Sequence, residues 1–179
     1  MHVSTRDFTV NHIVPIQVII KCCQELKEVY LAYNNEKSGH TDDNLEFFAK
    51  NISPNLEKLN LSSSDVSDDQ VEILLCRCNK LKVLILEETD VTSNSLKTIR
   101  QYLNLSLEEL TMSRYGYTSF LELIKMPRLK ILNLYANKED AKKIHNLIKL
   151  VPHLIVRTFF CDFSGEILPD LNLIYEDLD

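Results

Sequence analysis

The sequence predicts an α/β fold in which short parallel strands and helices alternate along the chain and stack into a curved solenoid. Two observations lead to this prediction. A leucine motif returns about every 25 residues, and an apolar stripe with helical spacing precedes each copy. One such unit cannot bury its leucines and its helix stripe alone, whereas stacked neighbours can. We therefore expect a parallel sheet on the concave side and helices on the convex side.

The motif is L-x-x-L-x-L with conservative apolar replacements, which is the pattern of leucine-rich repeats. Five copies and a degraded sixth are present, and their first residues are spaced by 30, 25, 26, 22 and 25 positions. Chance does not maintain this period over five intervals, so each copy predicts a short strand. The apolar positions are Leu26, Val29 and Leu31; Leu56, Leu59 and Leu61; Leu81, Leu84 and Leu86; Leu107, Leu110 and Met112; Leu129, Leu132 and Leu134; and Leu154 and Val156.

Helices are predicted before these strands because apolar residues recur there at i, i+3, i+4 and i+7, some copies following the spacing more loosely. The stripes cover residues 16–23, 45–52, 71–78, 96–103, 120–124 and 141–151. Two helix starts carry N-terminal signals, namely the capping-box pattern at 67–70 and Thr41-Asp42-Asp43. Pro127 and Pro152 follow helices and help to end them.

The turn after each strand departs from the strict repeat consensus, which places Asn there. Asn34 keeps the amide in the first repeat, and later repeats replace it in a way that fits an irregular intracellular subclass. The replacements are Ser64, Thr89 and Tyr115, with Asn again at Asn137.

Charge divides the chain into two parts. Residues 1–161 contain 20 basic and 20 acidic side chains, so the net charge of −6 belongs entirely to residues 162–179, which hold six acids and no base. We expect a repeat domain over 1–161 and an acidic C-terminal tail over 162–179. The tail also contains apolar residues, and two placements stay open: it caps the last repeat or crosses the concave face.

Several function classes are disfavoured by composition. The negative charge argues against nucleic-acid binding, and no apolar run reaches the roughly 18 residues that a membrane span needs. The five histidines and five cysteines form no metal-ligand spacing, and three glycines hardly suffice for a phosphate loop. Cys23 and Cys78 close helix stripes and are predicted to be core residues. We expect a protein that is no enzyme and holds no metal or cofactor.

The cysteine count and the N-terminus predict the compartment. An odd number of cysteines without a secretory signal favours reduced thiols, and hence the cytoplasm or the nucleus.

The concave face is the predicted partner-binding site. Side chains that alternate with the motif leucines point to this face, where three aliphatic residues and two tyrosines accompany Glu28, Glu87 and Glu109. Arg114 and Tyr115, with Tyr117, lie at the mouth of the fourth repeat and are residue types favoured in binding hot spots. The alternative is an ordinary sheet surface. The candidate partner-binding residues are Tyr30, Val83, Ile85, Glu87, Arg114, Tyr115, Ile131 and Tyr135.

A family resemblance rests on C-x-x-L at Cys23–Leu26 and Cys78–Leu81, in units of 25–26 residues. These units resemble the cysteine-containing leucine-rich repeats of the F-box protein family. Four stretches carry the resemblance in order, and together with their spacing they cover about residues 14–160. They are Asn55–Ser62, Leu110–Tyr115, Glu122–Leu132 and Val151–Leu154.

The resemblance implies the substrate-recognition arm of a Skp–cullin–F-box ubiquitin ligase, acting in ubiquitin-dependent degradation. In that family the repeats hold a protein substrate, sometimes with a small cyclin-dependent-kinase regulatory subunit as co-receptor. No F-box is visible, since only about 13 residues precede the first predicted helix. A Skp-type adaptor is therefore expected only if an F-box exists upstream. The alternative is a free-standing leucine-rich-repeat scaffold or inhibitor without a ligase link.

Overall fold

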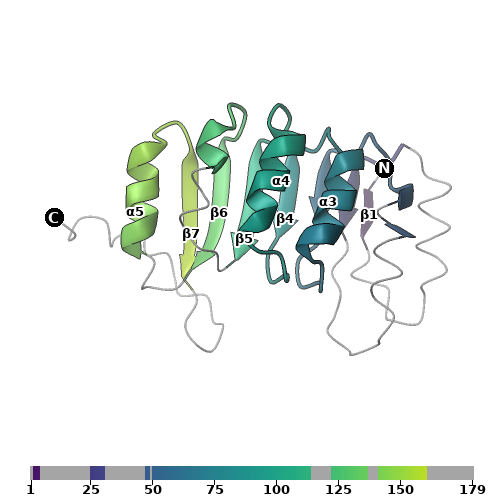
Figure 1. Ribbon diagram of the computed structural model, residues 1–179, viewed down its shortest axis with the longest axis horizontal. Helices are drawn as coiled ribbons and strands as arrows, with labels where there is room; N and C mark the ends of the chain where they lie inside the picture. Colours follow the sequence, from purple (N-terminus) through teal and green to yellow (C-terminus); the bar gives the residue numbers. More distant parts are fainter. Residues whose placement is uncertain are drawn as a thin grey trace.

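Among the described residues, seven strands form a single sheet in which every neighbouring pair is parallel (Figure 1). The computed structural model describes residues 2–4, 25–30, 47, 48, 50–113, 122–136 and 141–160. The strands lie in sequence order across the sheet. They are β1 (His2–Ser4), β2 (Glu28–Tyr30), β3 (Lys58–Asn60), β4 (Val83–Leu86), β5 (Glu109–Ser113), β6 (Ile131–Ala136) and β7 (Ile155–Phe160).

In the part of the chain that the structure describes, three helices lie on the same face of this sheet (Figure 1). They are α3 (Asp68–Arg77), α4 (Asn94–Leu103) and α5 (Ala141–Leu150). Parallel strands need crossover connections of one hand, and strands that follow in sequence order make every crossover step in the same direction. The connecting helices consequently share one face. The predicted α/β class with a parallel sheet is confirmed.

The core lies between the sheet and the helices. Every motif position whose side chain is described is buried, from Leu26 to Leu154, except Val156, which is partly buried. The central row of the sheet consists of Val29, Leu59, Leu84, Leu110, Leu132 and Val156, which are aligned by the strand register. The helix stripes supply the opposite wall, including Val71, Leu74 and Cys78 from α3 and Leu96 and Ile99 from α4.

Equivalent turns repeat the same contacts. The hydroxyls of Ser64 and Thr89 donate to the carbonyls of Leu61 and Leu86, at 2.6 and 3.0 Å. The predicted turn positions thus use hydroxyl groups to satisfy a backbone carbonyl at the end of the strand or directly after it. The residue before each hydroxyl, Ser63 or Glu88, has a positive φ of 56° or 52°.

The N-terminus of α3 has the predicted capping box. Ser67 is the N-cap, and its backbone N–H donates to Gln70 Oε1 at 2.9 Å. This arrangement satisfies N–H groups that an uncapped helix leaves without partners.

Three details differ from the sequence predictions. β1 was not predicted, because no copy of the leucine motif covers residues 2–4. The predicted helix at 120–124 is represented by a 3₁₀ turn over residues 122–125. This repeat has the shortest spacing, 22 residues, and a 3₁₀ turn fits a connection with fewer residues. The sixth motif copy, predicted as degraded, forms the six-residue strand β7.

Some predictions fall outside the described residues. The helix at 16–23, the helix start at 41–43 and the turn residues Asn34, Tyr115 and Asn137 are among them. The acidic tail over 162–179 also lies outside the described residues.

Candidate interaction face

The candidate site is the sheet face opposite the three helices. Alternate strand residues point to this face, because the residues between them are buried against the helices. The strand register aligns these side chains in rows across the sheet. The first row is Glu28, Lys58, Val83, Glu109, Ile131 and Ile155, and the second is Tyr30, Asn60, Ile85, Thr111, Asn133 and Arg157. From Glu28 to Ile131 in the first row, and from Tyr30 to Asn133 in the second, the order is the one predicted from the repeat alignment.

Aliphatic side chains concentrate in the C-terminal part of the first row. Val83 and Ile131 are half-buried and lie on either side of Glu109, while Ile155 is 56% exposed beside Ile131. Strands are spaced by about 4.8 Å, so Val83 and Ile131 lie about 10 Å apart across the sheet. Ile85 adds a half-buried aliphatic group in the second row on β4. We call Val83, Ile85, Ile131 and Ile155 the aliphatic patch.

A polar and aromatic cluster occupies β2 and β3. The Lys58 ammonium lies 5.2 Å from the centroid of the Tyr30 ring, and the Tyr30 hydroxyl donates to Glu28 Oε2 at 3.3 Å. The pKa of Lys58 is raised, mainly by its side-chain hydrogen bond with Tyr30. The charges of Glu28 and Glu109 raise this pKa further, whereas burial lowers it. Lys58 is therefore a cation held over an aromatic face.

Aromatic residues and an acid meet at the C-terminal ends of β4, β6 and β7. The Tyr135 and Phe159 rings stack with centroids 4.9 Å apart and an interplanar angle of 21°. Tyr135 also forms a side-chain hydrogen bond with Glu87. Burial raises the pKa of the Glu87 carboxyl, and the charge of Glu88 raises it further, while the bond with Tyr135 opposes both.

The centre of the face is less exposed than predicted. Thr111, Ser113 and Asn133 alternate with the motif residues of β5 and β6, which predicts an open position on the face, but all three are buried. Asn133 Nδ2 donates to Glu109 Oε1 at 2.8 Å and to Thr111 Oγ1 at 3.0 Å, and Ser113 Oγ accepts from the Glu88 N–H at 3.0 Å. These short side chains thus bond to residues on an adjacent strand or just after it.

The predicted partner-binding residues are distributed over this face. Val83 and Ile131 share the first row, and Tyr30 and Ile85 share the second row two strands apart. Glu87 and Tyr135 are in direct contact. Arg114 and Tyr115 lie outside the described residues, as does Tyr117.

β7 adds Ile155, Arg157 and Phe159 to the face, and none of these three residues was predicted there. A signal for these residues is present in the alternation of Ile155-Val156-Arg157-Thr158-Phe159. The loss of one residue from the sixth motif copy obscured it.

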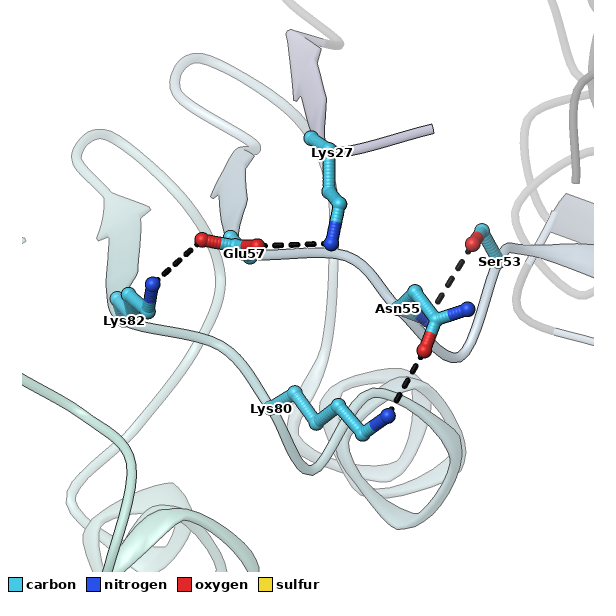
Figure 2. A network of polar contacts seen from close by, with 6 residues as sticks. All are labelled: Lys27, Ser53, Asn55, Glu57, Lys80 and Lys82. Carbon is cyan, nitrogen blue, oxygen red and sulfur yellow. Dashed lines mark hydrogen bonds and ion pairs between the residues drawn. The ribbon is translucent and has the colours of Figure 1, made fainter. Parts of the chain in front are cut away.

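A row of alternating charges runs along the edge where the strands begin. The residue directly before each strand from β2 to β6 is Lys27, Glu57, Lys82, Glu108 or Lys130. Glu57 lies between two cations, at 2.8 Å from Lys27 Nζ and 2.6 Å from Lys82 Nζ (Figure 2). Lys130 Nζ lies 2.6 Å from Glu108. We call these five residues the charge row; its alternation is readable once the repeats are aligned, but sequence reasoning missed it.

Hydrogen bonds and charges of both lysines lower the pKa of Glu57 to about 2, the hydrogen bond of Lys27 being the largest cause. The backbone repeats with the same regularity along the charge row. The carbonyl of Lys27 accepts from the N–H groups of Glu57 and Lys58, and the carbonyl of Glu57 accepts from Lys82 and Val83. Equivalent backbone positions therefore bring Lys27, Glu57 and Lys82, and separately Glu108 and Lys130, within ion-pair distance.

Reactive groups are few in the described part of the chain. Cys78 is buried, and burial raises the pKa of its thiol to about 12, as expected for the predicted core residue. Cys76 is exposed. The described residues contain no group of three His, Cys, Asp or Glu side chains that is able to hold a metal ion. Nor does any described helix combine the length and apolarity needed to cross a membrane.

Comparison with known protein families and curated proteins identifies no relative of this chain. No protein-family model matches the sequence, and no curated protein matches it closely enough to establish a relationship.

Proposed function

We propose that this chain is a leucine-rich-repeat solenoid that binds a protein partner on the sheet face opposite its helices. The observation that carries the proposal is that the strand register aligns the aliphatic patch on one face of the sheet. Three of its members, Val83, Ile131 and Ile155, lie in one row on a face that none of the described helices covers.

Both faces of a parallel sheet are normally covered in folded proteins, which favours a binding partner on the face without helices. Here one face packs against helices, and the other presents aliphatic groups beside polar ones. Grouped apolar side chains with charged neighbours are typical of interaction surfaces. Tyr30 and Tyr135 lie on the same face, and tyrosine supplies both apolar area and a hydroxyl to an interface.

The biological role that we propose is substrate recognition in a Skp–cullin–F-box ubiquitin ligase of the cytoplasm or nucleus. This part of the proposal rests on the resemblance of the repeats to the F-box family. The protein itself would have no catalytic group, and partner subunits would transfer ubiquitin. A small cyclin-dependent-kinase regulatory subunit is a candidate co-receptor in this role.

Co-purification from cells tests both parts of the proposal, the binding face and the ligase role. We expect the full-length gene product to retain cullin-ligase subunits together with further partners. Val83→Asp/Ile131→Asp is expected to lose the partners bound by the face while keeping the fold, because both side chains are only half-buried. Leu150→Asp is the matched control, since Leu150 is an exposed apolar residue at the end of α5.

The outcomes separate the two parts. Partner binding that is unchanged in Val83→Asp/Ile131→Asp contradicts the proposed face. A partner lost in this variant, without any Skp-type adaptor in the wild-type complex, contradicts the ligase role and leaves the free-standing scaffold or inhibitor as the function.

A further inference from the structure

A pocket of about 570 Å³ lies at the edge of the sheet where the strands begin, away from the proposed binding face. Its walls come from the segment between α3 and β4, from the end of α4 and from the turn before β6. Two of these segments carry cations that line the pocket, Lys80 and Lys82 between α3 and β4 and Arg128 before β6. The other lining residues that matter here are Glu57, Asn104 and Leu105.

The pocket is positively charged in a protein whose overall charge is −6. Lys80, Lys82 and Arg128 line the pocket with one carboxylate, Glu57, which is shared between Lys82 and Lys27. The nearby Glu108 carboxylate is paired with Lys130. The Lys80 ammonium donates to Asn55 Oδ1, a neutral acceptor, at 2.8 Å (Figure 2). Positive charge therefore exceeds negative charge locally, and it attracts an anion most strongly within about one Debye length of 8 Å.

Asn104 gives the pocket a second recognition element. It follows the last residue of α4, where the carbonyl of Leu103 accepts from the N–H groups of Ser106 and Leu107, both at 3.0 Å. The Ser106 hydroxyl is directed to the same carbonyl at 3.4 Å. The turn thus uses its donors on Leu103, and Asn104 Oδ1 is buried without a hydrogen-bond donor among the described residues. A buried acceptor of this kind favours a ligand that brings an N–H or O–H group.

An apolar contact lies beside these polar groups. Leu105 is 72% exposed, the most exposed of the large hydrophobic side chains in the described chain, and it lines the same pocket. An isolated exposed leucine needs no explanation, but one at the mouth of a basic pocket offers an apolar neighbour to the bound group.

We infer that this pocket binds an acidic peptide segment of a partner protein. An anionic side chain of the peptide lies between Lys80, Lys82 and Arg128, a peptide N–H donates to Asn104 Oδ1, and an adjacent apolar side chain packs on Leu105. The shared ligand chemistry is a negatively charged group on an extended peptide, supplied by Asp and Glu or by phosphoserine. The site is separate from the proposed sheet-face function and does not depend on it.

Fluorescence anisotropy with short labelled peptides tests the inference on the full chain. The probes are a peptide with a central Asp-Asp-Leu sequence, its phosphoserine analogue, and a neutral analogue with Asn in place of both acids. We expect the acidic peptides to bind and the neutral peptide to bind at least about tenfold more weakly. Binding is also expected to weaken as salt is raised, because the contacts are ionic.

Variants locate the binding. Lys80→Glu/Arg128→Glu is expected to weaken acidic-peptide binding by about tenfold or more, and Asn104→Leu by several-fold. The matched control is Lys97→Glu, which reverses an exposed charge on α4 outside the pocket lining and is expected to keep binding within about twofold of wild type. Circular dichroism confirms that each variant remains folded.

Each outcome supports or overturns the site. Tighter binding of the phosphoserine peptide assigns phosphate as the anion, and equal or tighter binding of the Asp peptide assigns carboxylate. Absence of binding, or equal loss in Lys80→Glu/Arg128→Glu and Lys97→Glu, overturns the inference. Peptide binding that survives in Val83→Asp/Ile131→Asp distinguishes this pocket from the sheet face.

Discussion

Asp68, in the first turn of α3, accepts a hydrogen bond from the hydroxyl of Ser95 in the first turn of α4, at 2.5 Å. The same carboxylate accepts from the Thr92 N–H at 2.8 Å and from the Thr92 hydroxyl at 2.5 Å. Burial alone would raise the pKa of Asp68, but the hydrogen bonds from Ser95 and Thr92 outweigh it and lower the pKa. One acid therefore links the N-termini of consecutive helices, where the helix dipoles also favour negative charge.

Replacing Asp68 with Ala is expected to destabilise the protein by about 1–2 kcal/mol, because the change removes a helix-terminal acceptor and leaves Ser95 without it. Urea unfolding near pH 7 measures the difference. The control is Asp69→Ala at the exposed neighbouring position, which is expected to change stability by less than about 0.5 kcal/mol. A double-mutant cycle with Ser95→Ala should show coupling, and strict additivity would contradict the link.

The ionised Glu57 carboxylate contributes stability that is lost when the pH becomes strongly acidic. Its pKa is about 2 in the folded protein against an ordinary value of 4.5, so its contribution is fully present above about pH 4.5. Protonation removes that contribution as pH falls through the folded pKa. We expect wild type to lose more stability than Glu57→Gln between about pH 4.5 and pH 2, as measured by urea midpoints. Parallel curves for the two proteins would show that the pairs with Lys27 and Lys82 do not stabilise the fold.

Leu84→Ala tests the buried central row of the sheet. Leu84 is fully buried between its row neighbours Leu59 and Leu110. Removing its branched end is expected to lower the free energy of unfolding by about 2–5 kcal/mol, since the cavity cannot close in a packed row. Leu150→Ala, at an exposed position of α5, is the control and is expected to cost less than about 0.5 kcal/mol. Similar losses in both variants would contradict the assignment of the core.

The two thiols near the end of α3 should differ in reactivity. Cys76 is exposed, whereas Cys78 is buried with a pKa of about 12, so little reactive thiolate forms at Cys78 at neutral pH. Brief alkylation of the native protein at pH 7.5, read by peptide mass spectrometry, is expected to label Cys76 and spare Cys78. Urea should then expose Cys78 to the reagent. Rapid labelling of Cys78 in the native state would contradict its place in the core.

Much of the fold follows from local patterns that need no tertiary information. The leucine period places β2 to β6, and the stripes and capping residues place α3, α4 and α5 within a few positions. The prediction was less successful where the repeat itself was irregular. β1 lies outside the leucine motif, the 22-residue unit contains a 3₁₀ turn at residues 122–125, and one missing residue concealed the alternation in β7.

The candidate site was predictable only in part. Alternation along each strand assigned Tyr30, Val83, Ile85, Ile131 and Tyr135 to the face, because side-chain direction in a strand depends on sequence position alone. The stacking of Tyr135 on Phe159 and the burial of Asn133 depend on side chains from adjacent strands, which no single motif contains.

The sequence by itself thus determined the repeat, the inward leucines and the neutrality of residues 1–161, since these properties are set by residue type and spacing. Tertiary structure alone decided which groups meet across repeats. It brings Asp68 to Ser95, places Glu57 between Lys27 and Lys82, and gathers Lys80, Lys82 and Arg128 around Asn104. The physical reason is that these contacts join residues more than 20 positions apart, whose distances are fixed only when the strands pair in register.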